Sequence, residues 1–513
     1  MKEGRFRYNW WGRGDIDASL GIFFDGFSKI LTASGVLMAF GIPASLILGK
    51  VLPGIGLAVF VGNLWYFFEA HRLAAKEQRQ DVTAQPFGLG ASQLSGWLYL
   101  IIGPVYWQTK DSLLALQVGL AANLIGGFIE IIGGFAGPWI VKHVPQEALM
   151  GNMASSALVW LSVVGMAMVF DRPIYGLLPL LIIIIDYMGK ADRRFQKIPS
   201  GVIAVLIGTV IAWSGGYLTM DNLMVSFSEM GFYPPMPAVK DLAAGLKGIL
   251  PFLPVIIPLQ INNFLSTLQG LEAAKAANDA YPERSSMIMD GVSTITGAVF
   301  GSPFPTTVYF GHPGWKALGA RAGFCVVNAV LYLVICTTGL TGVLMALIPT
   351  EAVMVLLIFV GFSVADSTFR STDKKYYSVI LLSMIPILFQ YIQSMIGSAV
   401  QAAGSSMEAL TARQFAAYSI PIQGIKYLGN GAFLSSLLLA GLLACVTDHH
   451  YGRAGGFALA LTGCSAVGLI HCDGVALFSE TGILFGVIYL ITAAVLFQKS
   501  CWLRKNKNNQ EVI

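Results

Sequence analysis

The chain has 513 residues, of which 55% are hydrophobic and only 12% are charged. A soluble protein carries about 25% charged residues, so this composition excludes an ordinary soluble enzyme or binding module. The apolar residues form many runs of about 17–25, the length that a helix needs to cross a bilayer. We therefore predict a polytopic membrane protein. The formal net charge of +4 arises from basic residues at loop ends, and we expect no nucleic-acid partner.

The six cysteines lie in or beside apolar runs and lack the spacing of a zinc finger or a redox pair. They are interpreted as small buried hydrophobes. The sequence contains no HExxH, G-x-S-x-G or P-loop pattern, which are the usual contexts of a metal, a nucleophile or a phosphate site. We therefore expect no cofactor, no metal and no enzymatic activity. A channel is a further alternative, which the transport rate per molecule would distinguish.

Hydrophobic runs between Pro, Gly and charge clusters predict sixteen spans, or fourteen followed by a hairpin. A basic and aromatic tail, 1–18, precedes them. In chain order the spans are 19–42, 51–70, 84–107, 112–136, 147–170, 173–189, 198–219, 249–270, 285–301, 303–314, 322–347, 350–367, 376–398, 430–447, 454–471 and 479–498.

The distribution of Lys and Arg predicts the orientation, because short cytoplasmic loops carry an excess of them. With the N-terminus inside, 24 of the 32 basic residues fall in cytoplasmic segments, 7 fall in outer loops and Lys29 lies within a span. The strongest clusters, at 71–79, 190–197, 370–375 and 498–507, all fall inside. We therefore predict that both termini are cytoplasmic.

The long polar stretch 220–248 divides the core spans into seven within 19–219 and seven within 249–447, with an extra hairpin and tail in 448–513. Because each half has an odd number of spans, the second half inserts upside down relative to the first. This is the inverted repeat of many transporters. The predicted fold is all-α and membrane-integral, with fourteen segments in two inverted repeats plus a C-terminal two-helix hairpin.

Two corresponding spans are interrupted. The third opens with TAQPFGLG (83–90), and the tenth comprises GSPFPTTVYFGHPG (301–314). Neither stretch can be helical throughout, because proline removes an amide donor and glycine weakens the helix. Non-helical backbone at membrane depth survives only inside protein or around an aqueous cavity. We therefore expect the two stretches to face each other and to offer unpaired amides to a polar ligand; ordinary surface kinks are the alternative.

At these residues the chain resembles the nucleobase/ascorbate (xanthine/uracil) permease superfamily, and within it the hypoxanthine/adenine/guanine permease branch. The similar stretches are TAQPFGLGA, LQINNFLSTLQG with GSPFPTTVYFGHPGW, and GDIDASLGIFFDGFSKI. The resemblance implies core and gate domains, broken helices 3 and 10, and a substrate between helices 3, 8 and 10. Family members carry acidic residues on helix 8 and two residues after the PTTxY tyrosine. Here those positions are Asn263 and Gly311, so both carboxylates are absent.

The polar residues of these spans, together with the resemblance, define the expected site. The expected substrate-binding residues are Gln85, Phe87, Asn263, Ser266, Thr267, Thr307, Gly311 and His312. The expected ion-coupling residues are Asp25, Glu130 and His312, because ionisable groups inside a membrane are commonly functional.

Each of these residues also has a structural interpretation. Asn263 and Thr267 could bond helix to helix, and His312 could make a hydrogen bond within a turn. Asp25 and Lys29 lie four residues apart and could form an ion pair. Asp290 is expected only to cap the ninth span.

We expect a secondary permease for a nucleobase, purine-like, or a related small polar solute, driven by a proton or sodium gradient in the cell membrane. The alternative is an anion carrier of the sulfate/bicarbonate type with the same fold, which Lys316 could serve. The expected partners are a small solute, a coupling ion and the lipid bilayer. Formation of a homodimer is left open.

The basic-residue bias generates a topology prediction. Reporter fusions at residue 240 and at residue 513 should report opposite sides of the membrane, with residue 513 in the cytoplasm. Equal signals from one side would contradict the predicted crossings.

Overall fold

The computed structural model describes residues 6–185, 200–309, 311–405, 407, 409–474 and 476–510. The basic cluster 190–197, the end of the sixth predicted span and the first two residues of the seventh lie outside the described residues. The chain divides into two compact units. The first is Met1–Pro138, Trp160–Leu250 and Asn263–Phe362, and the second is Trp139–Val159, Pro251–Asn262 and Ser363–Ile513.

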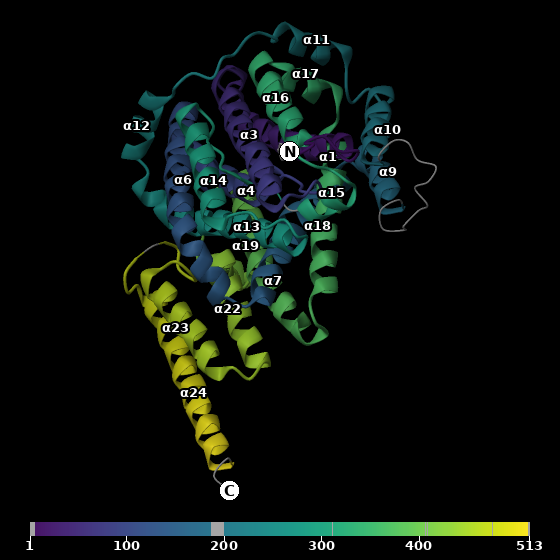
Figure 1. Cartoon of the computed structure of the whole chain (residues 1–513). Coiled ribbons are helices and arrows are strands. Elements are labelled where there is room, and N and C mark those ends of the chain that lie inside the picture. Colours follow the sequence, from purple (N-terminus) through teal and green to yellow (C-terminus); the bar gives the residue numbers. More distant parts are fainter. Residues whose placement is uncertain are drawn as a thin grey trace, which may run out of the picture. The chain divides into compact units, whose positions relative to one another are not determined.

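The first unit is helical apart from two short strands (Figure 1). Its elements are α1 Asp15–Ala39, α2 Ala44–Leu46, the π-helical turn η1 Ile47–Val51, α3 Leu52–Glu77, β1 Phe87–Leu89, α4 Ala91–Trp97, the π-helical turn η2 Leu98–Ile102, α5 Gly103–Thr109, α8 Val164–Asp171, α9 Pro173–Ile183, α10 Ser200–Ser214, α11 Met220–Ser228, α12 Val239–Lys247, α14 Glu283–Val299, β2 Thr306–Val308, α15 His312–Ala317, α16 Gly323–Thr338 and α17 Leu340–Leu347.

All regular elements among the described residues of the second unit are helices. Its elements are α7 Gln146–Ala157, the 3-10 turn η7 Lys374–Tyr376, α19 Tyr377–Ala402, α20 Ala412–Ala417, α21 Ile422–Gly429, α22 Ala432–Thr447, α23 Tyr451–Val467 and α24 Glu480–Gln510. The remaining elements contain residues of both units or lie at a boundary between them: α6 Ser112–His143, η3 Leu158–Val163, η6 Leu250–Phe252, α13 Leu253–Ala276 and α18 Thr350–Ser371.

The predicted all-α membrane class is confirmed. Among the described residues, six helices are long and apolar enough to span a bilayer: Asp15–Met38, Ala44–Glu77, Ser112–Gly137, Gln146–Asp171, Lys374–Val400 and Glu480–Leu503. Two further pairs, α16 with α17 and α21 with α22, pass the same test together but bend by 92° and 78°. The count of sixteen spans and the division at 220–248 stay predictions.

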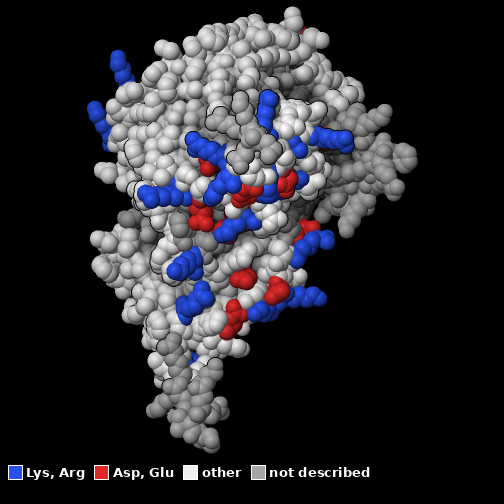
Figure 2. Space-filling view, in the orientation of Figure 1, with Lys and Arg blue, Asp and Glu red and all other residues white. Residues whose placement is uncertain are grey.

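Contacts within the first unit join several of its loops. At one end, Tyr8 of the N-terminal tail donates to Val82, and Arg321 donates to Asn9. At the other end, Lys50 pairs with Asp241. The first set joins segments predicted to be inside, and the second joins segments predicted to be outside. Figure 2 shows that Lys and Arg side chains lie close to Asp and Glu side chains on the face turned to the viewer.

The two interrupted stretches lie against each other, as predicted, and their backbones pair. Phe87–Leu89 and Thr306–Val308 form an antiparallel pair in which Gly88 lies opposite Thr307. The amide of Tyr309 extends the pairing by donating to the Pro86 carbonyl at 2.7 Å. Proline and glycine prevent a helix at both stretches, and mutual pairing then satisfies their backbone groups away from water. The expectation of unpaired amides is therefore wrong for these strands, because they bond to each other.

Close helix contacts hold the strand pair in place. α6 and α14 touch through Gly127 and Gly291: a Cβ on Gly127 would lie 2.8 Å from the Gly291 carbonyl. Small residues at this crossing let the two backbones approach. On α3, Gly62 accommodates the ring of Phe87. Figure 1 shows α3 beside α16, which lies far from it in the sequence, and the two helices make extensive contact.

The second unit is joined by short polar contacts between helices. Asn152 of α7 donates to the Phe433 carbonyl at 2.8 Å, and the hydroxyls of Ser155 and Ser383 are 2.8 Å apart. Three helices, α22, α23 and α24, occupy the region 430–498, where three apolar runs are predicted to cross the membrane.

The contact between α6 and α14 predicts an overpacking effect. Gly127→Ala should lower the free energy of unfolding by about 1–3 kcal/mol, because its methyl group meets the Gly291 carbonyl and a side chain of α14. Thermal unfolding of the detergent-purified protein measures the effect. Gly35→Ala is the matched control, since nothing lies within 4 Å of its Cβ position in α1; equal stability of the two variants would contradict the close approach.

Candidate functional site

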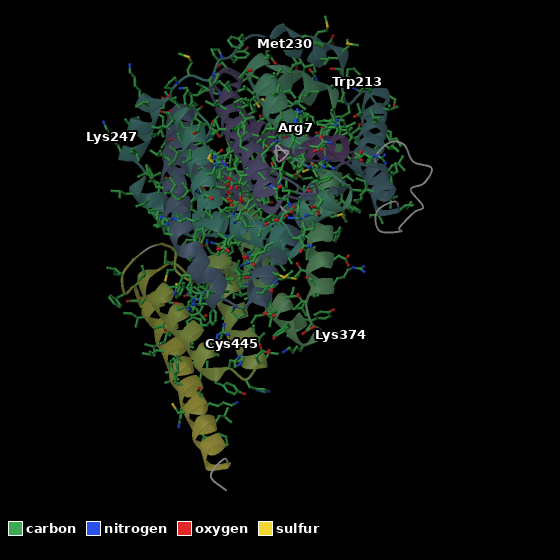
Figure 3. All side chains as sticks on the ribbon, in the orientation of Figure 1. Arg7, Trp213, Met230, Lys247, Lys374 and Cys445 are labelled. Carbon is green, nitrogen blue, oxygen red and sulfur yellow. The ribbon has the colours of Figure 1, made fainter. Side chains whose placement is uncertain are left out.

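Three groups of polar side chains surround the strand pair in the first unit. Backbone at this position needs partners from neighbouring helices. Asn63 of α3 donates to the Phe87 carbonyl at 3.1 Å, and Asn123 of α6 donates to the carbonyls of Ser302 and Phe304 at 3.0 Å each. In the view of Figure 3, oxygen atoms gather beside α3 and α14, which contact each other. The strand pair is thus the centre of a polar region inside an apolar protein.

The first group is built around Asp290, which is buried in the middle of α14. Tyr66 of α3 donates to one of its carboxyl oxygens at 2.6 Å, and Thr267 of α13 donates to the other. The Thr267 hydroxyl is also 2.9 Å from that of Thr307 in β2. The expectation that Asp290 only caps its helix is wrong, because α14 begins seven residues earlier at Glu283.

Glu130 and Asn263 form a direct contact in the same region. The Asn263 side-chain amide donates to Glu130 and, at 3.0 Å, to the carbonyl of Thr306. Thr294 of α14 lies 3.1 Å from the Thr306 hydroxyl and accepts a hydrogen bond from the Thr306 amide. Glu130 is buried well inside α6 rather than near a helix end.

The second group is an ion pair on α1. The ammonium group of Lys29 lies 2.8 Å from the Asp25 carboxylate and 3.6 Å from the centre of the Tyr309 ring. Tyr309 follows β2 directly, and its hydroxyl occupies the space where Gly88 would carry a side chain. The predicted i,i+4 pair therefore contacts the strand pair through an aromatic ring. A cation over such a ring is attracted by its negative face.

The third group is built around Asp279, between α13 and α14. Its carboxylate accepts from Lys316 at 2.6 Å, from Arg79 at 3.0 Å and from the Thr83 amide at 3.0 Å. The imidazole of His312 lies 3.3 Å from Asp279 and 2.9 Å from the Thr83 carbonyl. These contacts tie together the chain segments that lead into β1 and out of β2.

Burial works against the ionised form of Asp279, but hydrogen bonds from His312, Lys316 and the Thr83 amide outweigh it. Together they hold the pKa of this carboxyl below its usual range. Lys316, which was a candidate to bind an anion, instead forms an ion pair with Asp279.

The remaining expected residues take different places. Gln85 is buried and approaches the Gly270 carbonyl at 3.5 Å, and Ser266 is buried on α13. Phe87 is fully buried against α3, with its ring 5.4 Å from that of Tyr66. Gly311 has a φ of 110° and precedes α15. Glycine adopts this left-handed conformation without strain.

The sequence did not single out Tyr66, Asn63, Asn123 and Asp290 as partners of the site. Tyr66 and the two asparagines stand alone in apolar runs, where a hydrogen bond between helices is the commoner role. Their helical spacing does give a signal: Asn63 and Tyr66 lie three apart, and Asn123 and Glu130 lie seven apart, so each pair shares one face of its helix.

Comparison with known proteins gives matches among solved structures only. No family model and no curated protein match the chain. The transmembrane domain of a cyanobacterium bicarbonate transporter, BicA, is 17% identical, with a TM-score of 0.41, over 69% of this chain and 91% of that one. The murine anion transporter Slc26a9 in its inward-facing state is 13% identical, with a TM-score of 0.45, over 75% of this chain and 66% of that one.

A further structure of SLC26A9 is 14% identical, with a TM-score of 0.44, over 72% of this chain and 62% of that one. The chain thus spans less than two thirds of that protein. The expected membership of the nucleobase permease branch is wrong: no family model supports it, and the similar structures carry bicarbonate and anion transporter names. The absence of carboxylates at Asn263 and Gly311 agrees with this correction.

Six of the described helices are long and apolar enough to cross a bilayer. The chain is accordingly a multi-pass membrane protein, and non-helical segments inside such a protein are a frequent place for a binding site.

The Asp279 group predicts a pH-dependent stability. A carboxyl whose pKa is lowered by folding stabilises the protein above its unfolded pKa of about 4, and this contribution is lost as the pH falls through the folded value. Asp279→Asn should cost about 2–3 kcal/mol at pH 7 and should remove this part of the acid-induced loss. Thermal unfolding between pH 3 and 7 measures both effects.

Asp81→Asn is the matched control, because Asp81 pairs with the same Arg79 but is 67% exposed. It should have little effect on stability. A variant at Asp279 that is as stable as the Asp81 variant would show that the group does not hold these segments together.

Proposed function

We propose that the chain is a secondary transporter that carries a small inorganic anion, of the size of bicarbonate or sulfate, coupled to an ion gradient. The observation that carries this proposal is the position of Lys29. In the described part of the chain, it is the one lysine or arginine whose side chain is buried. A buried cation inside a span is costly and is commonly functional.

The contacts of Lys29 leave a hydrogen-bond donor of its ammonium group available to an anion. An ammonium group has three N–H donors, of which Asp25 receives one and the ring of Tyr309 faces the group from another side. The second carboxyl oxygen of Asp25 has no partner within the described structure. Asp25 and Lys29 form an ion pair within α1. An anion can bind Lys29 beside the strand pair without displacing a fully bonded carboxylate.

A cavity gives a solute a path towards this position. It is lined by Ser34 and Met38 of α1, Leu48 of η1 and Met345 of α17. Ser34 lies five residues beyond Lys29, or roughly 7.5 Å along the helix axis. The hydroxyl of Ser34 is buried and has no partner within the described residues. In the predicted topology this end of α1 faces outward, so the cavity supports access from outside.

The same topology supports a place in the cell membrane with both termini in the cytoplasm. Candidates to complete the anion site around the strand pair are Gln85, Ser266, Thr267 and Thr307. The proposed partners are the anion, a coupling ion and the lipid bilayer. Formation of a homodimer stays an open prediction.

The role of Lys29 can be tested by uptake of labelled bicarbonate, sulfate and chloride into proteoliposomes, with a labelled purine for comparison. Wild-type protein should take up at least one of the anions but not the purine. Lys29→Met should weaken anion binding about ten- to a hundredfold, because a charge-assisted hydrogen bond contributes about 1.5–3 kcal/mol.

Lys29→Arg keeps the charge and should retain part of the uptake. Lys275→Met is the matched control, since Lys275 is 53% exposed and pairs only with Glu272 in the described structure. Unaltered anion uptake by a folded Lys29→Met variant would remove the basis of the proposal.

A further inference from the structure

The contact between Glu130 and Asn263 leaves two hydrogen-bond acceptors without a partner in the described structure. One carboxyl oxygen of Glu130 accepts from the Asn263 amide, whose second hydrogen goes to the Thr306 carbonyl. The other carboxyl oxygen, Oε2, and the side-chain oxygen of Asn263, Oδ1, both lack a partner within the described structure. Both residues are at most 1% exposed. Two unpartnered acceptors therefore belong to one buried acid–amide contact.

An ionised Glu130 would leave this contact without compensation. The titratable groups that face it are Asp290 of α14 and Tyr66 of α3, and neither supplies positive charge. No lysine, arginine or histidine of the described chain forms an ion pair with Glu130, and Thr294 adds only a neutral hydroxyl. A buried charge without a partner costs several kcal/mol. The two bare oxygens would also repel each other.

A single proton resolves both defects. A protonated Glu130 donates from Oε2 to Oδ1 of Asn263 and accepts from the Asn263 amide at Oε1. The carboxylic acid and the primary amide then form a ring of two hydrogen bonds. The second amide hydrogen stays on the Thr306 carbonyl, so no donor or acceptor of the pair is left unsatisfied.

We propose that Glu130 and Asn263 form a proton-binding site, and that the proton bound there is the ion coupled to transport. The role of this proton in transport rests on the proposed function, whereas the proton-binding site itself does not. When the proton leaves Oε2 for water, the carboxylate faces Oδ1 and the Asn263 amide must turn. The amide then releases the Thr306 carbonyl of β2. Loss of the proton from Glu130 therefore changes the hydrogen bonding of the broken segment.

Glu130→Gln tests the site, because glutamine reproduces the protonated form. Its amide can donate to Oδ1 of Asn263, and its oxygen can accept from the Asn263 amide. In proteoliposomes this variant should retain exchange of the anion that the wild type carries, but it should lose accumulation driven by an inward proton gradient. Glu283→Gln, the same change in the first turn of α14, should retain both activities.

Infrared spectroscopy gives a readout that does not depend on transport. At neutral pH the wild type should show the carbonyl stretch of a buried protonated carboxyl group, and Glu130→Gln should lack it. Asn263→Ala, which removes the hydrogen-bond acceptor, should shift this band to higher frequency. This second variant keeps the test decisive if the glutamine variant does not fold.

The outcomes separate the two proposals. If the wild type transports no tested anion but shows the band, the proposed function fails and the proton site stands. If the wild type lacks the band, or if Glu130→Gln keeps it, the proton site is overturned. Undiminished proton-driven accumulation by Glu130→Gln would overturn its coupling role.

Discussion

The structure depends on one constraint: backbone donors and acceptors inside a membrane protein must find partners without water. Two segments rich in proline and glycine cannot meet it as helices, and they meet it by pairing with each other as β1 and β2. The pairing is only three residues long on each side, so much of its surrounding backbone still needs partners. Asn63 and Asn123 provide them from α3 and α6. Some of the polar side chains in the interior are therefore there to bond the backbone in and beside the two strands.

The charged groups around the strand pair differ in how fully they are satisfied. Asp279 accepts four contacts from residues on both sides of the pair, which makes it a fixed point. Glu130 and Asp25 each retain a carboxyl oxygen that has no hydrogen-bond partner among the described residues. A saturated carboxylate suits a structural role, whereas an unsatisfied one can change partner at lower cost. His312, which the sequence suggested as a substrate or proton residue, contacts the saturated group.

Sequence reasoning succeeded where the physical signal is local. Composition and run length identify the membrane class, and prolines and glycines at 83–90 and 301–314 identify the interruptions. It failed where the answer depends on distant contacts. Asp290 was expected to cap the ninth span, but its helix begins seven residues earlier at Glu283. The ion pair of Lys316 joins it to Asp279, 37 residues away, which no local pattern reveals.

The PTTxY resemblance failed for a different reason. Thr306 contacts Thr294, Thr307 contacts Thr267, and the ring of Tyr309 lies under Lys29. Each polar residue of the motif thus has a partner inside the protein. A motif whose side chains bond within the protein indicates the fold. It need not indicate which solute the protein carries.

The pairing of β1 with β2 has a consequence for biogenesis. Leu89 and Thr306 are partners, so the ribosome must add more than two hundred residues before the first strand can find the second. At about 5–20 residues per second, roughly 10–45 s pass in which Phe87–Leu89 has no strand partner. Its backbone cannot stay unbonded in lipid for that time. The segment must wait in water or within the insertion machinery, so assembly of this protein finishes only after its second half has entered the membrane.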